Sequence, residues 1–143
     1  INLRSPWWSK ELVQSSLHRA DWVKLNEHEL DILLQSDADA ETRCRQFMEI
    51  YDLQGLVVTR GAQGAELHTN DSIYSVQPES GKQIVDTVGA GDAFCSVILL
   101  GLLSGWPYQQ MLDRAQAFAS EIVAQRGATV SDTGFYQDII SNW

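Results

Sequence analysis

Residues 86–94, with the sequence DTVGAGDAF, combine a run that could bind an anion with a carboxylate that could act as a base. Gly89, Ala90 and Gly91 precede Asp92, and an apolar run follows, which predicts a turn that opens a helix. Small residues let the backbone approach a ligand closely, and the first amides of a helix are unpaired donors. The helix dipole adds partial positive charge at the same place. The amides of residues 89–92 could therefore hold a phosphate without any lysine.

Asp92 adds chemistry that anion binding alone does not need, because its charge repels the anion that the neighbouring amides attract. An ionised carboxylate here could accept the proton of an alcohol while the amides stabilise charge on a transferring phosphoryl group. The alternative is that Asp92 is an N-cap and the glycines only form a tight turn, which is the commoner role of an isolated GxGD. No GxxxxGK[ST] motif occurs, and GAGDAF lacks the third glycine of the dinucleotide fingerprint.

Composition restricts the ligands that this chain can bind. The 143 residues carry a formal net charge of -9, and the isoelectric point is about 4.6. Lys and Arg form no basic cluster, so we expect no nucleic-acid partner. A polyanionic ligand would have to be held by local donors against an unfavourable overall field. Hydrophobic content of 44% and charged content of 20% predict one soluble globular core.

The sequence also speaks against a membrane protein and against a disulfide framework. The longest apolar run, residues 93–103, is interrupted by Ser96 and Gly101 and is shorter than the roughly 20 residues of a membrane helix. Cys44 and Cys95 are far apart and form no CxxC pair. No targeting segment is visible in the given sequence. We therefore expect a cytoplasmic protein with no membrane partner.

Apolar strands alternate with helical patterns, which predicts a layered α/β domain with a mainly parallel sheet. Trp7 and Trp8 are expected in the core or at an interface, whereas the isolated His18, His28 and His68 are expected at the surface. The predicted strands are residues 1–3, 22–25, 55–59, 65–68, 73–76 and 83–85. The predicted helices are one that enters at Ser5 and Pro6, and residues 26–34, 37–52, 92–104, 108–125 and 134–141.

Several segments together resemble the ribokinase-like (PfkB) family of carbohydrate kinases over essentially the whole chain. DTVGAGDAF with the following CSVILLGLL is similar to the C-terminal signature of that family. The other similar segments, in order, are Asn2-Leu3-Arg4 with Trp8 (the NLR..LW segment of fructokinase-like members), WVKLNEHEL (their NxxE segment), VVTRGAQG (their nucleotide-side strand and turn), and Arg126-Gly127-Ala128 with Asp132, Phe135 and Tyr136 (their closing segment).

The resemblance implies transfer of the γ-phosphate of ATP to a sugar hydroxyl. Asp92 would be the base, and the amides of Gly89, Ala90 and Gly91 would form the anion hole. The other implied roles are Asn26 and Glu29 in placing Mg²⁺ and phosphate through water, Thr59, Gly61 and Gly64 in contacting the nucleotide, Asp86 and Thr87 in a loop that holds a monovalent cation such as K⁺, and Asn2 and Arg4 in approaching the acceptor or phosphate.

Structural alternatives exist for these implied roles. Asn26 and Glu29 satisfy a capping box, a role that can coexist with metal placement. Thr59 and the two glycines after it could simply build a hairpin turn. Arg4 could make a structural ion pair.

Members of the family also carry an N-terminal half with a glycine-rich sugar motif and a β lid, which these residues do not contain. We therefore expect residues 1–143 to be the C-terminal, nucleotide-side half of a layered α/β/α ribokinase-like domain. Its partners would be ATP and a sugar, with fructose favoured over 2-keto-3-deoxygluconate, ribose or nucleosides. Alone it should be nearly inactive, because positioning of both substrates is lost. An uncovered core could drive homodimerisation. The rival hypothesis is a non-catalytic nucleotide- or sugar-binding module.

Overall fold

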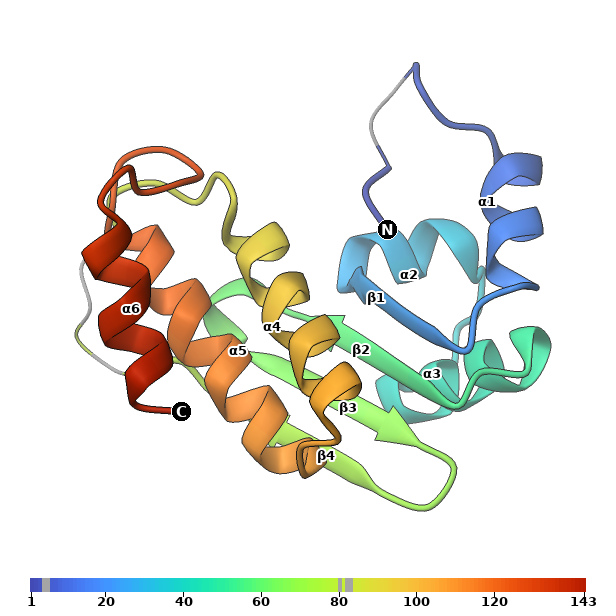
Figure 1. The fold of residues 1–143 in the computed structure, drawn as a ribbon. Helices are drawn as coiled ribbons and strands as arrows, with labels where there is room; N and C mark the ends of the chain where they lie inside the picture. Colours follow the sequence, from blue (N-terminus) through green and yellow to red (C-terminus); the bar gives the residue numbers. More distant parts are fainter. Residues whose placement is uncertain (4–5, 80, 82–83) are drawn as a thin grey trace. The chain divides into compact units, whose positions relative to one another are not determined.

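The computed structural model describes residues 1–3, 6–79, 81 and 84–143, and it divides the chain into two compact units. The first unit comprises Ile1–Gly61 and Ala65–Tyr74, and the second comprises Ala62–Gly64 and Ser75–Trp143. Figure 1 shows the elements of both along the chain. No helix in the described part of the chain is both long and apolar enough to cross a membrane.

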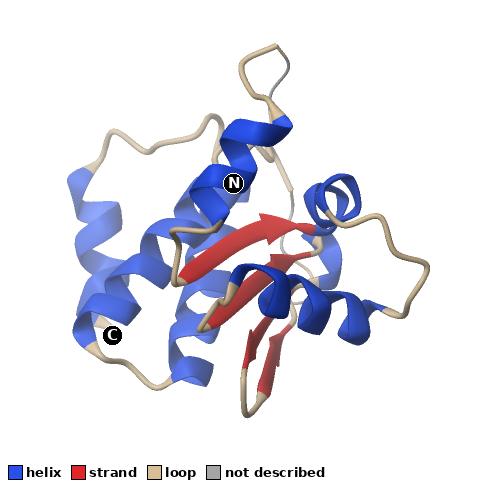
Figure 2. Cartoon of the chain, turned by 90° about the vertical axis from the view of Figure 1, so that its right-hand side faces the viewer, coloured by secondary structure: helices blue, strands red, loops and turns tan. Residues whose placement is uncertain are grey.

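A four-stranded sheet organises the chain, with the strand order β1-β2-β3-β4 (Figure 2). The strands are β1 (Trp22–Asn26), β2 (Gly55–Thr59), β3 (Ala65–Thr69) and β4 (Ile73–Val76). β1 and β2 are parallel, so their carboxyl ends meet with Asn26 beside Thr59. β2 and β3 are antiparallel, and Thr59 lies opposite Ala65 at the last pair. The α/β class is thus confirmed, but the sheet is mixed, and the expectation of a mainly parallel sheet holds for β1 and β2.

Three α-helices belong to the first unit: α1 (Lys10–Leu17), α2 (Glu27–Leu33) and α3 (Ala40–Tyr51). α3 begins at Ala40 rather than near Asp37, because the Asp39 side chain accepts a hydrogen bond from the Thr42 amide and so caps the helix. It ends at Tyr51, and the C-cap residue Asp52 has a left-handed φ of 52°. A short 3₁₀ turn, η1 (Gly61–Gln63), follows β2.

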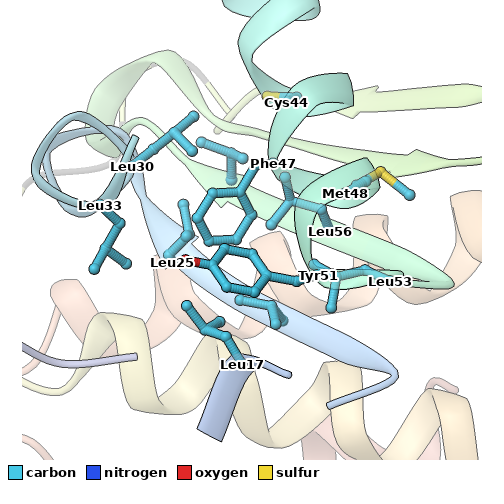
Figure 3. Close-up of a cluster of buried hydrophobic side chains, with 12 residues drawn as sticks. Leu17, Leu25, Leu30, Leu33, Cys44, Phe47, Met48, Tyr51, Leu53 and Leu56 are labelled. Atoms are coloured by element: carbon cyan, nitrogen blue, oxygen red, sulfur yellow. The ribbon is translucent and has the colours of Figure 1, made fainter. Parts of the chain in front are cut away.

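The core of the first unit is formed by β1 and β2 together with α1, α2 and α3 (Figure 3). Cys44, Phe47 and Tyr51 recur at the helical spacing of three or four residues, and all three are buried. The Phe47 and Tyr51 rings have centroids 4.9 Å apart. Burial of each large apolar side chain contributes about 1.5–3 kcal/mol. The other members are Leu17, Val23, Leu25, Leu30, Leu33, Met48, Leu53, Leu56 and Val58.

The second unit contains the helices α4 (Ala90–Ser104), α5 (Tyr108–Val123) and α6 (Thr133–Ser141). α4 and α5 pack side by side and are joined by a short turn (Figure 1). Gly101 allows this approach, since a Cβ there would lie 2.5 Å from Met111 Cγ. The Arg114 guanidinium lies 4.2 Å from the centre of the Trp106 ring and donates to the Trp143 carbonyl, which ties the end of the chain to α5.

Several local expectations are wrong. The predicted strand of residues 1–3 is not formed. The first helix begins at Lys10, because the Ser9 side chain accepts a hydrogen bond from the Leu12 amide and so caps it. The predicted entry at Pro6 therefore falls outside the helix. Ser5, the other residue of that predicted entry, lies outside the described residues. Trp7 is therefore not part of an apolar helix face and is 83% exposed. Ile84 and Val85 do not form a strand, since Val85 donates its amide to the Val123 carbonyl at the end of α5; Gln83 lies outside the described residues.

His68 also departs from expectation, because it is buried rather than at the surface. Its Nε2 lies 3.0 Å from Glu66 Oε2, two residues away on the same face of β3. His18 and His28 are exposed as expected. Cys44 and Cys95 are free thiols, as predicted, and burial raises the pKa of Cys44 to about 11.

Candidate functional site

Gly89 sets the geometry of the turn before α4. Its φ of 85° and ψ of −13° are left-handed, a conformation that strains any residue with a Cβ. A Cβ at this position would also lie 2.6 Å from the Ala128 Cα. Position 89 therefore requires glycine for the packing of the turn itself, in addition to any ligand that approaches it.

Backbone donors remain available at the start of α4. The Ala90 amide makes a long hydrogen bond of 3.4 Å to the Thr87 carbonyl, and the Ala93 amide donates to Gly89 over 2.8 Å to begin the helix. Between them, the amides of Gly91 and Asp92 donate to no other described residue. These donors lie at the positive end of a helix of 15 residues. The arrangement can bind an anion through backbone groups alone.

Asp92 is the third residue of α4 and is exposed. The N-cap is Gly89, and no side chain caps the helix, so the alternative that Asp92 is the N-cap is wrong. Its carboxylate makes no hydrogen bond to another residue in the described ranges. A carboxylate that is both ionisable and accessible therefore stands directly beside the unpaired amides.

Asp86 fixes the loop that precedes the turn. Its Oδ1 accepts from the Val88 amide at 2.9 Å, and its Oδ2 accepts from the Gly127 amide at 3.1 Å. These two backbone hydrogen bonds lower the pKa of Asp86. The loop with Asp86 and Thr87 is thus tied to the segment after α5 that contains Ala128. Sequence reasoning placed residues 126–128 in a similar segment of the family but gave them no such supporting role.

In the first unit, Asn26 and Glu29 form the predicted capping box of α2. Asn26 Oδ1 accepts from the Glu29 amide at 2.8 Å, and Glu29 Oε2 accepts from the Asn26 amide at 2.9 Å. Glu29 Oε1 also accepts from the Leu3 amide at 3.1 Å, and the residue is only 5% exposed. Glu29 therefore holds the segment of the exposed Asn2 against the start of α2. Arg4, which was assigned with Asn2, lies outside the described residues.

The predicted nucleotide-side residues follow β2. Thr59 lies beside Asn26 in the sheet, and its hydroxyl makes a long hydrogen bond of 3.4 Å to the Leu25 carbonyl. Gly61 has a φ of 55° and open space where a Cβ would point. Gly64 has a different reason to be glycine, because a Cβ there would lie 1.9 Å from the Val76 carbonyl oxygen. Of these two glycines, Gly61 is therefore the one that leaves room for a ligand close to its backbone.

The first unit brings together Asn26, Glu29 and Thr59, at the carboxyl ends of two parallel strands, where α/β proteins commonly bind ligands. The second unit brings Asp86 and Thr87 together with residues 89–92. An open cavity of about 580 Å³ between α3 and the β3–β4 turn is lined by none of the predicted catalytic or ligand-binding residues. Within the described ranges, no three His, Cys, Asp or Glu side chains are grouped to hold a metal ion.

Comparison with known proteins identifies consistent relatives. The family model described as pfkB family carbohydrate kinase matches residues 1–133. A 2-dehydro-3-deoxygalactonokinase of Haloferax volcanii is 31% identical over 84% of this chain and 39% of its own length. A fructokinase of Escherichia coli is 29% identical over 89% of this chain and 44% of its own length.

The fold is also found among solved structures. That of a putative ribokinase II from E. coli, in complex with ATP and Mg²⁺, matches with a TM-score of 0.77 at 23% identity. The match covers 96% of this chain and 47% of the other, and at this identity it shows a common fold alone. The chain spans less than half the length of each of these three proteins.

Proposed function

Because this chain belongs to the pfkB family of carbohydrate kinases, we propose that it is the C-terminal, nucleotide-side part of an ATP-dependent kinase that phosphorylates a sugar hydroxyl. The observation that carries this proposal is the exposed Asp92 on the first turn of α4, beside the unpaired amides of Gly91 and Asp92. Pure anion binding has no need of that carboxylate. A kinase needs both a base and an anion hole.

In the proposed reaction, Asp92 accepts the proton of the sugar hydroxyl as that oxygen forms a bond to the γ-phosphorus. The bond from the γ-phosphorus to the bridging oxygen of ADP breaks in line. The amides at the start of α4, including those of Gly89, Ala90 and Gly91, stabilise the charge on the transferring phosphoryl group. The loop of Asp86 and Thr87 is proposed to hold a monovalent cation such as K⁺, and it supports this turn through its bond to Gly127.

Magnesium, when bound, would neutralise charge on the ATP phosphates. Mg²⁺ typically keeps several water ligands and is bound by few protein groups together with phosphates. Both oxygens of the buried Glu29 already accept backbone hydrogen bonds, and the described residues offer no three-ligand cluster. Asn26 and Glu29 thus fit a role in which they act on the ion through water, as a support for its hydration shell.

For the acceptor, we propose a primary hydroxyl of a small sugar or sugar acid, with fructose favoured. The support is the Asn2-Leu3-Arg4 segment, together with the similarity to a fructokinase and to a 2-dehydro-3-deoxygalactonokinase. Thr59, Gly61 and Gly64 are proposed to contact the nucleotide. The open space at Gly61 is consistent with close approach of a ligand to the backbone there.

The test is sugar-dependent ADP release by the full-length parent protein and its Asp92→Asn variant. We expect Asp92→Asn to lower kcat by about 100-fold or more, the usual contribution of a positioned base. Asp138→Asn is the matched control, because Asp138 is an exposed aspartate on α6 of the same unit and makes no proposed contact with substrate. The control should stay within about twofold of the wild type. A loss of only a few-fold in Asp92→Asn would remove Asp92 as the base. Absence of sugar-dependent ADP release from the wild-type parent would favour the rival hypothesis of a binding module.

A further inference from the structure

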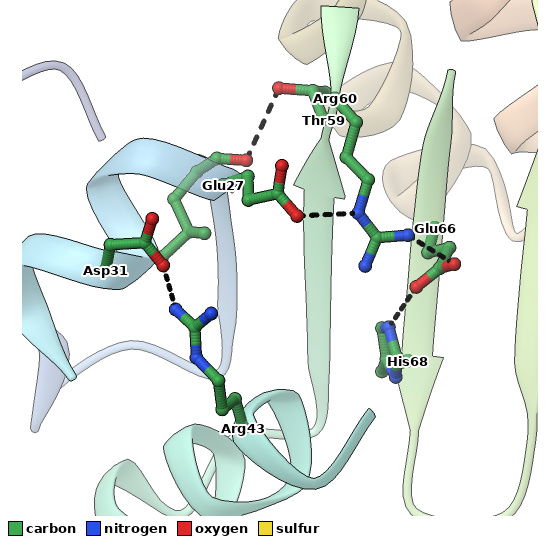
Figure 4. A network of polar contacts seen from close by, with 8 residues as sticks. Glu27, Asp31, Arg43, Thr59, Arg60, Glu66 and His68 are labelled. Carbon is green, nitrogen blue, oxygen red and sulfur yellow. Dashed lines mark hydrogen bonds and ion pairs between the residues drawn. The ribbon is translucent and has the colours of Figure 1, made fainter. Parts of the chain in front are cut away.

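A network of charged side chains joins three elements of the first unit through Arg60 (Figure 4). Arg60 Nη1 lies 2.5 Å from Glu66 Oε1 on β3, and Arg60 Nε lies 3.4 Å from Glu27 Oε1 at the first residue of α2. Glu66 Oε2 in turn contacts His68 Nε2 at 3.0 Å. Arg60 itself directly follows the last residue of β2.

Burial makes this network more than a surface ion pair. The side chain of Arg60 is 16% exposed and that of Glu66 is 27% exposed, so water and salt screen their interaction only in part. Burial by itself raises the pKa of Glu66. The hydrogen bond and charge of Arg60, together with His68, lower it by a larger amount, so the pKa of Glu66 lies below its usual value. Arg60 Nε makes no hydrogen bond, so Glu27, whose side chain is 49% exposed, is a purely electrostatic partner.

Because Arg60 directly follows β2, its ion pairs hold the turn after that strand in place. Thr59 and Ala65 form the last pair of β2 and β3, and Arg60 reaches back from the following turn to Glu66, one residue beyond that pair. On its other side, Arg60 faces Glu27, which follows Asn26 directly. One guanidinium therefore fixes the backbone between Thr59 and Gly61 relative to both β3 and the start of α2.

We propose that Arg60 is a positioning residue for the nucleotide. It holds the turn with Thr59 and Gly61 against the capping box of Asn26 and Glu29, so that both segments meet ATP in one fixed arrangement. Arg60 acts through these segments and not by contact with phosphate, since two of its nitrogen atoms already face carboxylates. This inference rests on the proposed function, which assigns the nucleotide to these segments.

Arg43 offers a matched control for the test. Its side chain is also 16% exposed, it also pairs with a carboxylate of α2, Asp31, and its Nε is likewise buried without a hydrogen bond. Arg43 lies on α3, and among the described residues it makes no ion pair or hydrogen bond to the turn after β2. Arg43→Met thus removes one ion pair and Arg60→Met removes two from the same unit, and only the second substitution frees the turn.

The experiment measures binding of a non-hydrolysable ATP analogue with Mg²⁺ to the full-length parent by calorimetry, together with kcat and both KM values. For Arg60→Met we expect the Kd of the analogue and the KM for ATP to rise about tenfold, because small displacements of positioning groups are costly. The KM for the sugar should stay within about twofold. Arg43→Met should leave all of these constants within about twofold. Its urea midpoint should also fall, but by less than that of Arg60→Met, because Arg43 loses one ion pair and Arg60 loses two. Equal effects of the two substitutions on the Kd would overturn the inference.

Milder variants keep the test decisive if Arg60→Met does not fold. Glu66→Gln keeps the size of the side chain and one acceptor oxygen, and Arg60→Lys keeps the charge without the planar guanidinium. Each should raise the Kd by a smaller factor of about three to five, and the double variant Glu66→Gln with Arg60→Lys should show less than the product of the single effects. An unchanged Kd in both single variants, with the fold intact, would also overturn the inference.

The two kinds of measurement separate failure of this inference from failure of the proposed function. A parent protein that binds the analogue but releases no ADP with any sugar would contradict the proposed kinase, and the Kd comparison of the arginine variants would still decide the role of Arg60. A parent that turns over sugar, with an Arg60→Met variant that keeps wild-type ATP affinity, would leave the kinase standing and remove Arg60 as a positioning residue.

Discussion

Gly89 lies so close to Ala128 that a Cβ at position 89 would stand 2.6 Å from the Ala128 Cα. The backbone at Gly89 is also left-handed, with a φ of 85°. Gly105 provides a comparison within the same unit, because its φ is 65° but a Cβ there would meet no atom within 4 Å. The two glycines separate the cost of a left-handed backbone from the cost of a steric overlap.

We therefore expect Gly89→Ala to destabilise the parent protein more than Gly105→Ala. Both substitutions place alanine in a left-handed conformation, which costs about 1–2 kcal/mol. The overlap with Ala128 adds a further cost of about 1–3 kcal/mol at position 89 alone. Gly89→Ala should also lower ADP release strongly, because the turn positions the amides at the start of α4. Urea unfolding and the kinase assay measure both effects, and equal losses in the two variants would contradict the close approach.

Glu29→Gln tests the buried carboxylate that links the Leu3 segment to α2. Its two oxygens accept from the amides of Asn26 and Leu3, so a glutamine must point its NH₂ group at one of these donors. We expect a loss of about 1–3 kcal/mol in the free energy of unfolding, the cost of an unsatisfied buried polar group. Glu41→Gln, an exposed change in the first turn of α3, serves as the control and should have little effect. Equal stability of the two variants would show that the Glu29 bonds are not stabilising.

Acid should reveal the contact between Arg60 and Glu66. The pKa of Glu66 is lower in the folded protein than in the unfolded chain, where it is about 4.3. The stabilisation by ionised Glu66 is therefore complete above about pH 4.3 and is lost as the pH falls through the lowered pKa of the folded state. We expect the difference in unfolding free energy between wild type and Glu66→Gln to be constant from pH 7 to about pH 5 and to shrink at lower pH. Urea titrations from pH 7 to pH 3 measure this difference. A gap that stays constant down to pH 3 would exclude an ionised Glu66 in this contact.

The two cysteines should differ in reactivity. Cys44 is fully buried, and burial raises its pKa to about 11, so little thiolate is present at neutral pH. Cys95 is only partly buried. We expect iodoacetamide at pH 8 to label Cys95 well before Cys44 in the folded protein, and both equally in urea. Peptide mass spectrometry follows the labelling, and comparable rates in the folded state would contradict the burial of Cys44 on the inner side of α3.

Local signals in the sequence predicted much of the fold. β2 and β4 have the predicted bounds, because polar turn residues border each run on both sides. The capping box at Asn26 was also readable from spacing alone. The start of α1 could not be predicted in this way, since two helix entries are equally good by residue type. One is Ser5 with Pro6, and the other is Ser9. The contact of the Ser9 side chain with the Leu12 amide decides between them.

The parts of the candidate site that depend on contacts distant in sequence could not be predicted. Nothing near Arg60 in the chain indicates that it faces Glu27, which lies 33 positions earlier and is brought there by the pairing of β1 with β2. The burial of His68 could not be predicted either, because the charged Glu66 two residues away on the same face of the strand indicates an exposed face. The clash that would exclude a side chain at position 89 depends on Ala128, beyond the end of α5.

An exposed apolar face of α4 bears on how this chain behaves when it is produced alone. Leu99 and Leu103 are four residues apart and so lie on one side of the helix, and Leu103 is 87% exposed. Exposed leucines in such a row favour association. We expect residues 1–143 alone to self-associate at micromolar concentration and to show no sugar-dependent ADP release, whereas the double variant Leu99→Gln with Leu103→Gln should shift towards monomer. Sedimentation velocity distinguishes these outcomes. A monomeric chain with rapid turnover would show both that this face needs no cover and that residues 1–143 are sufficient for catalysis.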